Sequence, residues 1–388
     1  MKDKGILTNV YLILFLYCVA PVANAQIRNK VCDTIHYEFI KDKIIIPVTV
    51  NNVKTKYLVD TGGRTGTMRN AAAEMKAVSA GYKQIADINT QSNSFQEAYI
   101  QDITIGEQYK LNQLKTLVFP HNPFLEELGV AGILGGDAFA QSVITFDSRS
   151  QIMVINYPYR PERLKVNDGT PLTDDNNYSK FKIRIGSAEK NILFDTGAHG
   201  FLLYSNNDLE KLQTVSGSKT VNHGHGIIAA GIAGLGTPVD IKKVVVPSIH
   251  ILGKDFTNVG SVTTVMSETI IGVDLLKYGK VIIDYMRKLI YFFPYNEEAT
   301  DMKGAVPLWN VNVLPRNKRF EVTTVWDSIK DKVNIGDEVV NINGTSLEGC
   351  PMTQEAVEKI MDAIPGETGY IIVRKENKEK RIEIKKEK

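Results

Sequence analysis

The tripeptide Asp-Thr-Gly occurs twice in this chain, each time directly after an apolar run that is predicted to be a strand. The first copy lies in YLVDTGGRTGTM, residues 57–68, and the second in ILFDTGAHGFLL, residues 192–203. One copy alone carries little information, because Asp and Gly are common turn residues. Two copies that end equivalent strands predict a duplicated unit, which narrows the folds open to the chain.

The residues around the two copies repeat with them. When Asp60 is aligned with Asp195, apolar strand positions coincide: Val48 with Ile183, Val50 with Ile185, and Leu58 with Leu193. Farther along, ILGGDAFAQSVITFD at residues 133–147 matches IIGVDLLKYGKVIID at residues 270–284. The repeat therefore extends over most of each expected unit.

We expect two homologous β lobes in a pseudo-twofold arrangement, at residues 28–158 and 162–298. Short apolar runs punctuated by Gly, Asn, Asp and Pro, with few long helical periods before residue 300, indicate a mainly β fold. The segment KIIIPVTVNN at residues 43–52 alternates and is followed at once by KYLVDTG, which predicts a β-hairpin.

The pattern changes after residue 300, and we expect a third, small α+β domain at residues 303–388. TQEAVEKIMDAIPG predicts a helix with Thr353 as its N-cap and Pro365-Gly366 as its end. Two strands, YIIVRK and KRIEIK, follow around a charged turn.

Residues 1–25 are expected to be a secretory signal peptide, because two Lys residues precede a short apolar stretch and an Ala-Asn-Ala cleavage pattern. The alternative, a membrane helix, is disfavoured by the shortness of the apolar run, and we expect no membrane span in the mature chain. Export predicts a periplasmic or secreted protein. The net charge of +2 gives no reason to expect nucleic-acid binding. Cys32 and Cys350 could pair, but two cysteines are no disulfide framework and unpaired thiols are favoured.

A pseudo-twofold arrangement would place Asp60 and Asp195 side by side. Two carboxylates that close cannot both ionise cheaply, so one keeps a proton while the other remains a base. The ionised member could then deprotonate a water that attacks an amide carbonyl, while the protonated member donates to the carbonyl oxygen. Both residues are therefore our candidate catalytic residues.

The neighbouring residues are predicted to support this pair. Thr61 and Thr196 could hydrogen-bond across the axis. Gly62 and Gly197 would let backbone N–H groups approach the carboxylates without a Cβ in the way. Ala198 completes the second loop, whereas the first loop has Gly at the matching position 63.

These motifs resemble the retropepsin-like branch of the aspartic proteases, in a single-chain bacterial form. The resemblance covers roughly residues 40–296 and includes the apolar-apolar-Gly strands Ile133-Leu134-Gly135 and Ile270-Ile271-Gly272. It implies peptide-bond hydrolysis without a metal or an organic cofactor, in an exported bacterial protein. The family pattern usually has Ala or Ser after Asp-Thr-Gly, so Gly63 departs from it.

Other repeated or reactive residues are expected to be structural. Four repeated acids, Asp137, Asp274, Asp147 and Asp284, are predicted to hold turns. The resemblance places flaps at residues 89–99 and 224–234, the second being rich in Gly and Ala. Around the start of the second flap, His223 and His225 lack a Cys or acidic neighbour in sequence, so a solvated loop is favoured over a metal site.

The segment FEVTTVWDSIKDKVNIGDEVVNING resembles a bacterial PDZ domain, through Gly336-Asp337 and Ile342-Asn343-Gly344. Such domains bind an extended peptide beside a strand, often by its C-terminal carboxylate. We expect the ligand strand near residues 320–325, facing the helix that starts at Gln354. The alternative is a structural domain that steadies the second lobe.

The sequence therefore predicts an exported aspartic endopeptidase that acts on polypeptides, with Asp60 and Asp195 as its acid and base. The alternative is a non-catalytic exported peptide-binding protein built on the same lobes. Gly63 favours that alternative. The two facing acids favour the enzyme, because a binding protein has no reason to keep two carboxylates that repel each other.

Overall fold

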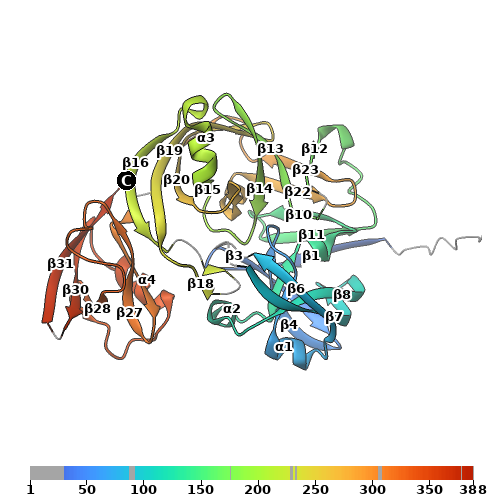
Figure 1. Ribbon diagram of the computed structural model, residues 1–388. Helices are drawn as coiled ribbons and strands as arrows, with labels where there is room; N and C mark the ends of the chain where they lie inside the picture. The colour runs from blue at the N-terminus through green and yellow to red at the C-terminus, as the bar shows by residue number, and fades with distance from the viewer. Residues whose placement is uncertain are drawn as a thin grey trace, which may run out of the picture.

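The computed structural model is mainly β, which confirms this part of the predicted fold class (Figure 1). The residues that it describes are 30–86, 92–174, 176–227, 230–231, 234–304, 308–376 and 378–387. The expected signal peptide lies outside them. We refer below to the first half (residues 30–158), the second half (162–304) and the C-terminal part (308–387).

The first half is built around one eight-stranded sheet. In sheet order its strands are β2 (Glu38–Ile40), β3 (Lys43–Val50), β4 (Val53–Asp60), β9 (Gly132–Gly135), β5 (Gly66–Met68), β8 (Tyr109–Phe119), β7 (Ser92–Ile105) and β6 (Val78–Ala86). Two short helices, α1 (Arg69–Glu74) and α2 (Pro123–Glu127), accompany it. The predicted hairpin is confirmed: β3 and β4 pair across Asn51 and Asn52, which both adopt positive φ values of 48° and 66°.

The second half repeats this arrangement around the second Asp-Thr-Gly. In sheet order its strands are β24 (Thr300–Gly304), β20 (Lys254–Thr264), β15 (Leu202–Ser205), β21 (Ile270–Gly272), β14 (Ala188–Asp195), β13 (Lys180–Ile185), β19 (Val239–Ile251) and β16 (Lys219–Gly226). A small pair, β17 (Ala230–Gly231) and β18 (Gly234–Leu235), and helix α3 (Asn206–Ser216) complete it. The strand that ends in Asp runs parallel to the apolar-apolar-Gly strand in both halves, β4 with β9 and β14 with β21.

A six-stranded sheet joins the two halves. Its order is β1 (Val31–His36), β11 (Ile152–Tyr157), β10 (Val143–Asp147), β22 (Gly279–Asp284), β23 (Leu289–Pro294) and β12 (Thr170–Pro171). Short 3-10 helices occur at η1 (Gly136–Phe139), η2 (Val166–Asp168) and η3 (Val273–Lys277). β10 of the first half pairs with β22 of the second, and the largest buried apolar cluster contains residues of both halves. The two halves therefore share one core.

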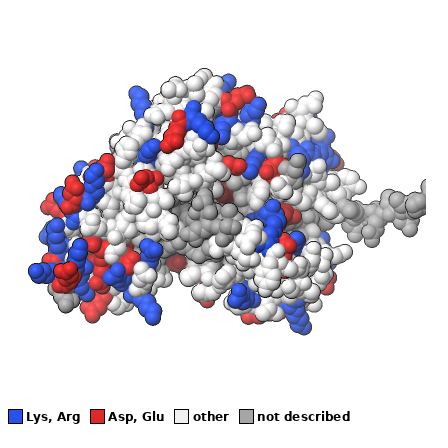
Figure 2. All heavy atoms as spheres, viewed as in Figure 1, with Lys and Arg blue, Asp and Glu red and all other residues white. Residues whose placement is uncertain are grey.

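The C-terminal part has a separate core. Its strands are β25 (Leu308–Trp309), β26 (Val311–Arg316), β27 (Arg319–Trp326), β28 (Glu338–Ile342), β29 (Thr345–Ser346), β30 (Thr368–Lys375) and β31 (Lys378–Glu387). The predicted helix is confirmed as α4 (Gln354–Asp362), with the Thr353 hydroxyl accepting a hydrogen bond from the Ala356 N–H at 3.3 Å. Charged side chains of both signs are interspersed over this part in Figure 2.

The prediction that the strand near residues 320–325 faces the helix is wrong. β27 has β26 along one edge, and its other edge is occupied by β28 at Glu321 and by β16 at residues 324–326. The strand that packs against α4 is β26. Pro315 weakens the strand signal of VNVLPR, so the sequence pattern pointed to the neighbouring strand instead.

The pairing of β16 with β27 joins the C-terminal part to the second half in one continuous sheet. Glycines allow this approach: a Cβ on Gly224 would lie 2.7 Å from the Trp326 ring, and one on Gly226 would lie 2.6 Å from the Thr324 Cα. The segment predicted as the second flap thus begins in a strand that the C-terminal part holds. Residues 228, 229, 232 and 233 of that segment, and 89–91 of the first, lie outside the described residues.

Two further predictions concern the cysteines and a possible membrane span. Cys32 and Cys350 are both free thiols. Within the described ranges, no helix has the length and apolar character needed to cross a membrane.

Candidate active site

The structure brings the two Asp-Thr-Gly turns together through reciprocal hydrogen bonds. The Thr61 N–H donates to the Thr196 hydroxyl at 3.1 Å, and the Thr196 N–H donates to the Thr61 hydroxyl at 3.1 Å. Each hydroxyl then donates at 2.8 Å to a carbonyl of the opposite strand, Thr61 to Phe194 and Thr196 to Val59. These four bonds are buried and fix the position of one turn relative to the other.

The carboxylates of Asp60 and Asp195 follow the same symmetry. Each accepts a hydrogen bond from the glycine two residues later, from Gly62 at 3.0 Å and from Gly197 at 2.7 Å. A Cβ on Gly197 would lie 2.5 Å from the Asp60 Cγ, and one on Gly62 would lie 2.6 Å from the Asp195 Oδ2. Each carboxylate therefore packs against the glycine of the other turn, and a larger residue would not fit.

The closeness of the two acids affects the ionisation of Asp60. The pKa of Asp60 is raised well above its ordinary value, first by burial and then by the charge of Asp195 and a hydrogen bond with it. The N–H groups of Gly62 and Gly63 oppose this rise. Because each charge disfavours ionisation of the other acid, the two carboxyl groups are expected to titrate as a unit.

Gly63, which departs from the family pattern, also fits the site closely. A Cβ at this position would lie 2.7 Å from the Asp60 Oδ2. The matching residue of the second turn, Ala198, is buried and packs with Leu193 and Ile270. The departure at Gly63 is thus explained by the close approach of Asp60.

The four other repeated acids bind turns or neighbouring strands. Asp137 accepts hydrogen bonds from the N–H and hydroxyl of Thr65, at 3.0 and 2.6 Å. It thereby holds the loop that follows the first Asp-Thr-Gly turn. We call the pair Asp60 and Asp195 the dyad, and the two Asp-Thr-Gly turns the dyad turns. Asp147 forms an ion pair with Lys280 at 2.6 Å. The remaining contacts are Asp274 with Lys277 at 2.7 Å and Asp284 with Arg287 at 3.2 Å.

Sequence reasoning missed two buried residues near the pair. Lys43, only 8% exposed, lies at the start of β3, close enough to both acids for their charges to act on it. Burial lowers the Lys43 pKa, and the charges of Asp195 and Asp60 oppose that change. Tyr285 is buried with its hydroxyl 3.1 Å from Ser179, and burial raises its pKa while the charge of Asp60 adds to the rise.

No local signal in the sequence identifies these two residues. A Lys before an apolar strand usually lies at the surface, and a Tyr after a strand is an ordinary core residue. Their place beside the acids follows from strand register and from the joining of the two halves.

A hollow lies elsewhere, between β16, β19 and the C-terminal part, with a volume of about 450 Å³. His223 and His225 line it from strand β16, so the prediction that they belong to a loop is wrong. His225 pairs with Asp240 at 2.7 Å. Over the described residues, no group of three or more His, Cys, Asp or Glu is placed to hold a metal ion.

Comparison with known proteins adds no identification. No family model matches the chain, and no curated protein matches it. The site is defined by its own geometry, as two aspartates on facing turns that hydrogen-bond to each other within a duplicated, mainly β scaffold.

Proposed function

We propose that this protein is an aspartic endopeptidase of the retropepsin-like kind, with Asp60 and Asp195 as its catalytic residues. The observation that carries the proposal is the reciprocal Thr61–Thr196 bonding, which holds two carboxylates in symmetric turns. The resemblance of both turns, and of the strands behind them, to that family supports the same conclusion. The alternative of a non-catalytic peptide-binding protein gives no reason for a shared proton between two buried acids.

The raised pKa of Asp60 suggests a division of labour. Asp195 is the base that takes a proton from a water lying between the carboxylates, and the resulting hydroxide attacks the carbonyl carbon of a peptide bond. Protonated Asp60 donates to the carbonyl oxygen, which gives a neutral tetrahedral intermediate. When the C–N bond breaks, the proton held by Asp195 passes to the leaving nitrogen, and the diol proton returns to Asp60.

The scaffold contributes rigidity rather than further reactive groups. The buried threonine bonds hold the turns in place, and the glycine N–H groups orient one oxygen of each carboxylate. Such preorganisation lowers the cost of reaching the transition state.

The test is cleavage of an unfolded protein and of a diverse peptide library, from about pH 3 to about pH 8. Asp60→Asn and Asp195→Asn should each lower the rate by at least about a thousand-fold, because each removes an acid or base of the reaction. Asp274→Asn, a repeated acid bound to a lysine instead, is the matched control and should remain active. Cleavage by the wild type but also by folded Asp195→Asn would reject the dyad.

We infer further that the C-terminal part is a PDZ-like domain that adds a peptide beside β26. In the described part of the chain, β26 pairs with β27 alone, and α4 packs on it. An open strand edge next to a helix suits β-strand addition of an extended peptide.

Peptide addition can be tested with the full chain carrying Asp60→Asn, so that the ligand survives. Titration with labelled peptides that have free or amidated C-termini should show saturable binding, stronger for the free carboxylate. Equal, non-saturable signals for both sets would leave the C-terminal part as a structural domain.

A further inference from the structure

The turn between β2 and β3, Lys41-Asp42-Lys43, connects three parts of the molecule. Lys41 and Asp42 both have positive φ values, 50° and 56°, as in the tight turns that connect paired strands. The three successive charged side chains reach different partners. We call residues 41–43 the charged turn.

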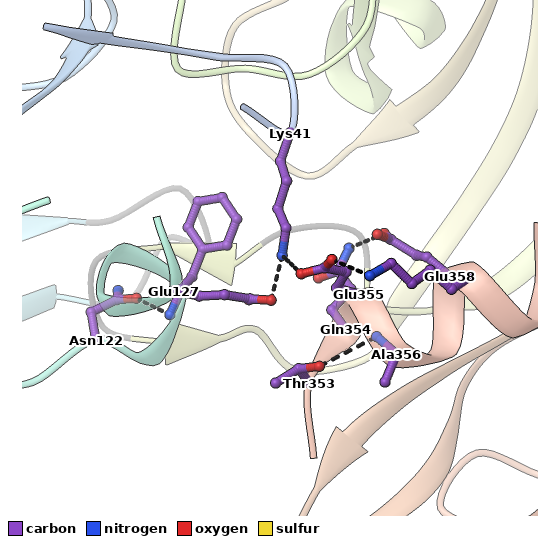
Figure 3. A network of polar contacts seen from close by, with 10 residues as sticks. Lys41, Asn122, Glu127, Thr353, Gln354, Glu355, Ala356 and Glu358 are labelled. Atoms are coloured by element: carbon purple, nitrogen blue, oxygen red, sulfur yellow. Dashed lines mark hydrogen bonds and ion pairs between the residues drawn. The ribbon is translucent and has the colours of Figure 1, made fainter. Parts of the chain in front are cut away.

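Lys41 links the first half to the C-terminal part. Its ammonium group binds Glu127 of α2 and lies 3.6 Å from a carboxylate oxygen of Glu355 in α4 (Figure 3). The side chains of Lys41 and Glu127 are only 23% and 22% exposed. The contact with Glu127 therefore positions the ammonium group that Glu355 meets.

Glu355 is itself held at the start of its helix. It lies in the first turn of α4, where a negative charge is favourable. Its other carboxylate oxygen pairs with Lys359 one turn later, at 2.7 Å. The Thr353 cap fixes the helix start below it (Figure 3).

Asp42 links the first half to the second half beside the candidate active site. Its carboxylate lies 2.7 Å from the Nδ1 of His199, which follows directly after the second dyad turn. Lys43, the last residue of the charged turn, is buried, and the charges of Asp195 and Asp60 act on it. One turn thus carries a contact to the C-terminal part, a contact to the second half and a lysine beside the dyad.

The C-terminal part is attached very differently to the two halves. Its strand β27 pairs with β16 of the second half. Glu387, near its end, accepts hydrogen bonds from Asn222 at 3.1 Å and from the buried Lys243 at 2.7 Å. Towards the first half, Lys41–Glu355 is the one hydrogen bond or ion pair formed between described residues.

We propose that the charged turn is a latch, in which Lys41–Glu355 holds the first half against the C-terminal part and Asp42–His199 holds the same turn beside the two aspartates. Neither pair is fully buried, so both can break and reform. Release of the latch separates the first half from the C-terminal part and so favours bulky polypeptides. This consequence for substrates rests on the proposed function, whereas the latch itself does not.

The latch can be measured without catalysis, by distances between two spin labels. One label is placed on Asn70→Cys, an exposed position of α1, and the other on native Cys350, in a background that carries Cys18→Ser and Cys32→Ser. The parent protein should give one narrow distance distribution. Glu355→Gln and Lys41→Met should each add a population at longer distance.

Lys359→Met is the matched control, because it removes the partner of Glu355 within the helix and leaves the first half untouched. It should keep the parent distribution. If Glu355→Gln and Lys41→Met both keep that distribution in the folded state, the latch is rejected. Glu355→Gln retains Lys41–Glu127, so it tests the interpart contact even if Lys41→Met misfolds.

Cleavage then tests the consequence. Glu355→Gln should raise kcat/KM for a folded protein substrate roughly two- to five-fold, as expected for loss of an exposed ion pair, and leave short peptides unchanged. An equal increase for both substrates would overturn this consequence for bulky substrates. Absence of any cleavage by the parent protein would refute the proposed function, while the distance measurement would still decide the latch.

Discussion

The two Asp-Thr-Gly turns have the same backbone arrangement, but the side chains that flank them differ in charge. Alignment of Asp60 with Asp195 places Lys41-Asp42-Lys43 on Asn176-Asn177-Tyr178, and His199 on Arg64. On one side Asp42 pairs with His199 at 2.7 Å. On the other, the Arg64 guanidinium lies 5.6 Å from the centre of the Tyr178 ring.

The hydrogen bonds within the two turns are the same in both halves, whereas the side chains around the turns differ. The threonine bonds that build the turns are equal in length on the two sides. The flanking side chains have diverged, and Lys41 on one side forms an ion pair with the C-terminal part. Symmetry of the scaffold therefore coexists with different surroundings for the two turns.

The largest expected contrast is between Gly63→Ala and Ala198→Gly, which exchange the residues at matching positions. Gly63→Ala places a Cβ 2.7 Å from the Asp60 Oδ2 and should displace that carboxylate, lowering cleavage by roughly a hundred-fold. Ala198→Gly removes one buried methyl group and should cost activity only a few-fold. Steady-state cleavage of one peptide by both variants checks this, with circular dichroism to confirm folding. Equal losses would mean that the two turns are equivalent after all.

The two threonines, in contrast, should contribute equally to stability. Thr61→Val and Thr196→Val each remove a buried hydroxyl that accepts one hydrogen bond and donates another. Each should lower the free energy of unfolding by about 1–3 kcal/mol, and by the same amount within error, because an N–H and a carbonyl lose their partner. Chemical denaturation of both variants measures it. A several-fold difference between the two losses of unfolding free energy would show that the two threonines are not equivalent.

Several elements followed from local sequence patterns. The β3–β4 hairpin was expected from an alternating run and its Asn-Asn turn, and α4 from Thr353 and its apolar face. The approach of Asp60 to Asp195 was expected from duplication alone, since equivalent strand ends meet at a pseudo-twofold axis. These inferences need only short-range patterns or symmetry.

Other contacts could not be read in this way. The pairing of β16 with β27 joins strands about a hundred residues apart in a chain where both show ordinary strand patterns. Lys43 and Glu355 belong to the residue types that normally lie at the surface, so nothing local marks one as buried by the dyad and the other as an interpart contact. Such contacts depend on how separate sheets dock.

The smallest predicted effect concerns stability and follows from the raised pKa of Asp60. A carboxyl whose pKa is higher in the folded state binds more protons there than in the unfolded chain, so stability falls as pH rises from about 3.8 towards the raised pKa. Asn cannot ionise, and Asp60→Asn should therefore be more stable than the wild type at neutral pH by about 1–2 kcal/mol. The difference should vanish at pH values below the ordinary range of the acid.

Asp195→Asn and the double variant sharpen this prediction. Because each carboxylate raises the cost of ionising the other, removing either one relieves the same repulsion. The gain of the double variant should thus fall short of the two single gains added together. Denaturation of all four proteins at neutral and acidic pH provides the test. Additive gains, or a less stable Asp60→Asn at neutral pH, would mean that the two acids do not interact and that the asymmetry between the turns has another origin.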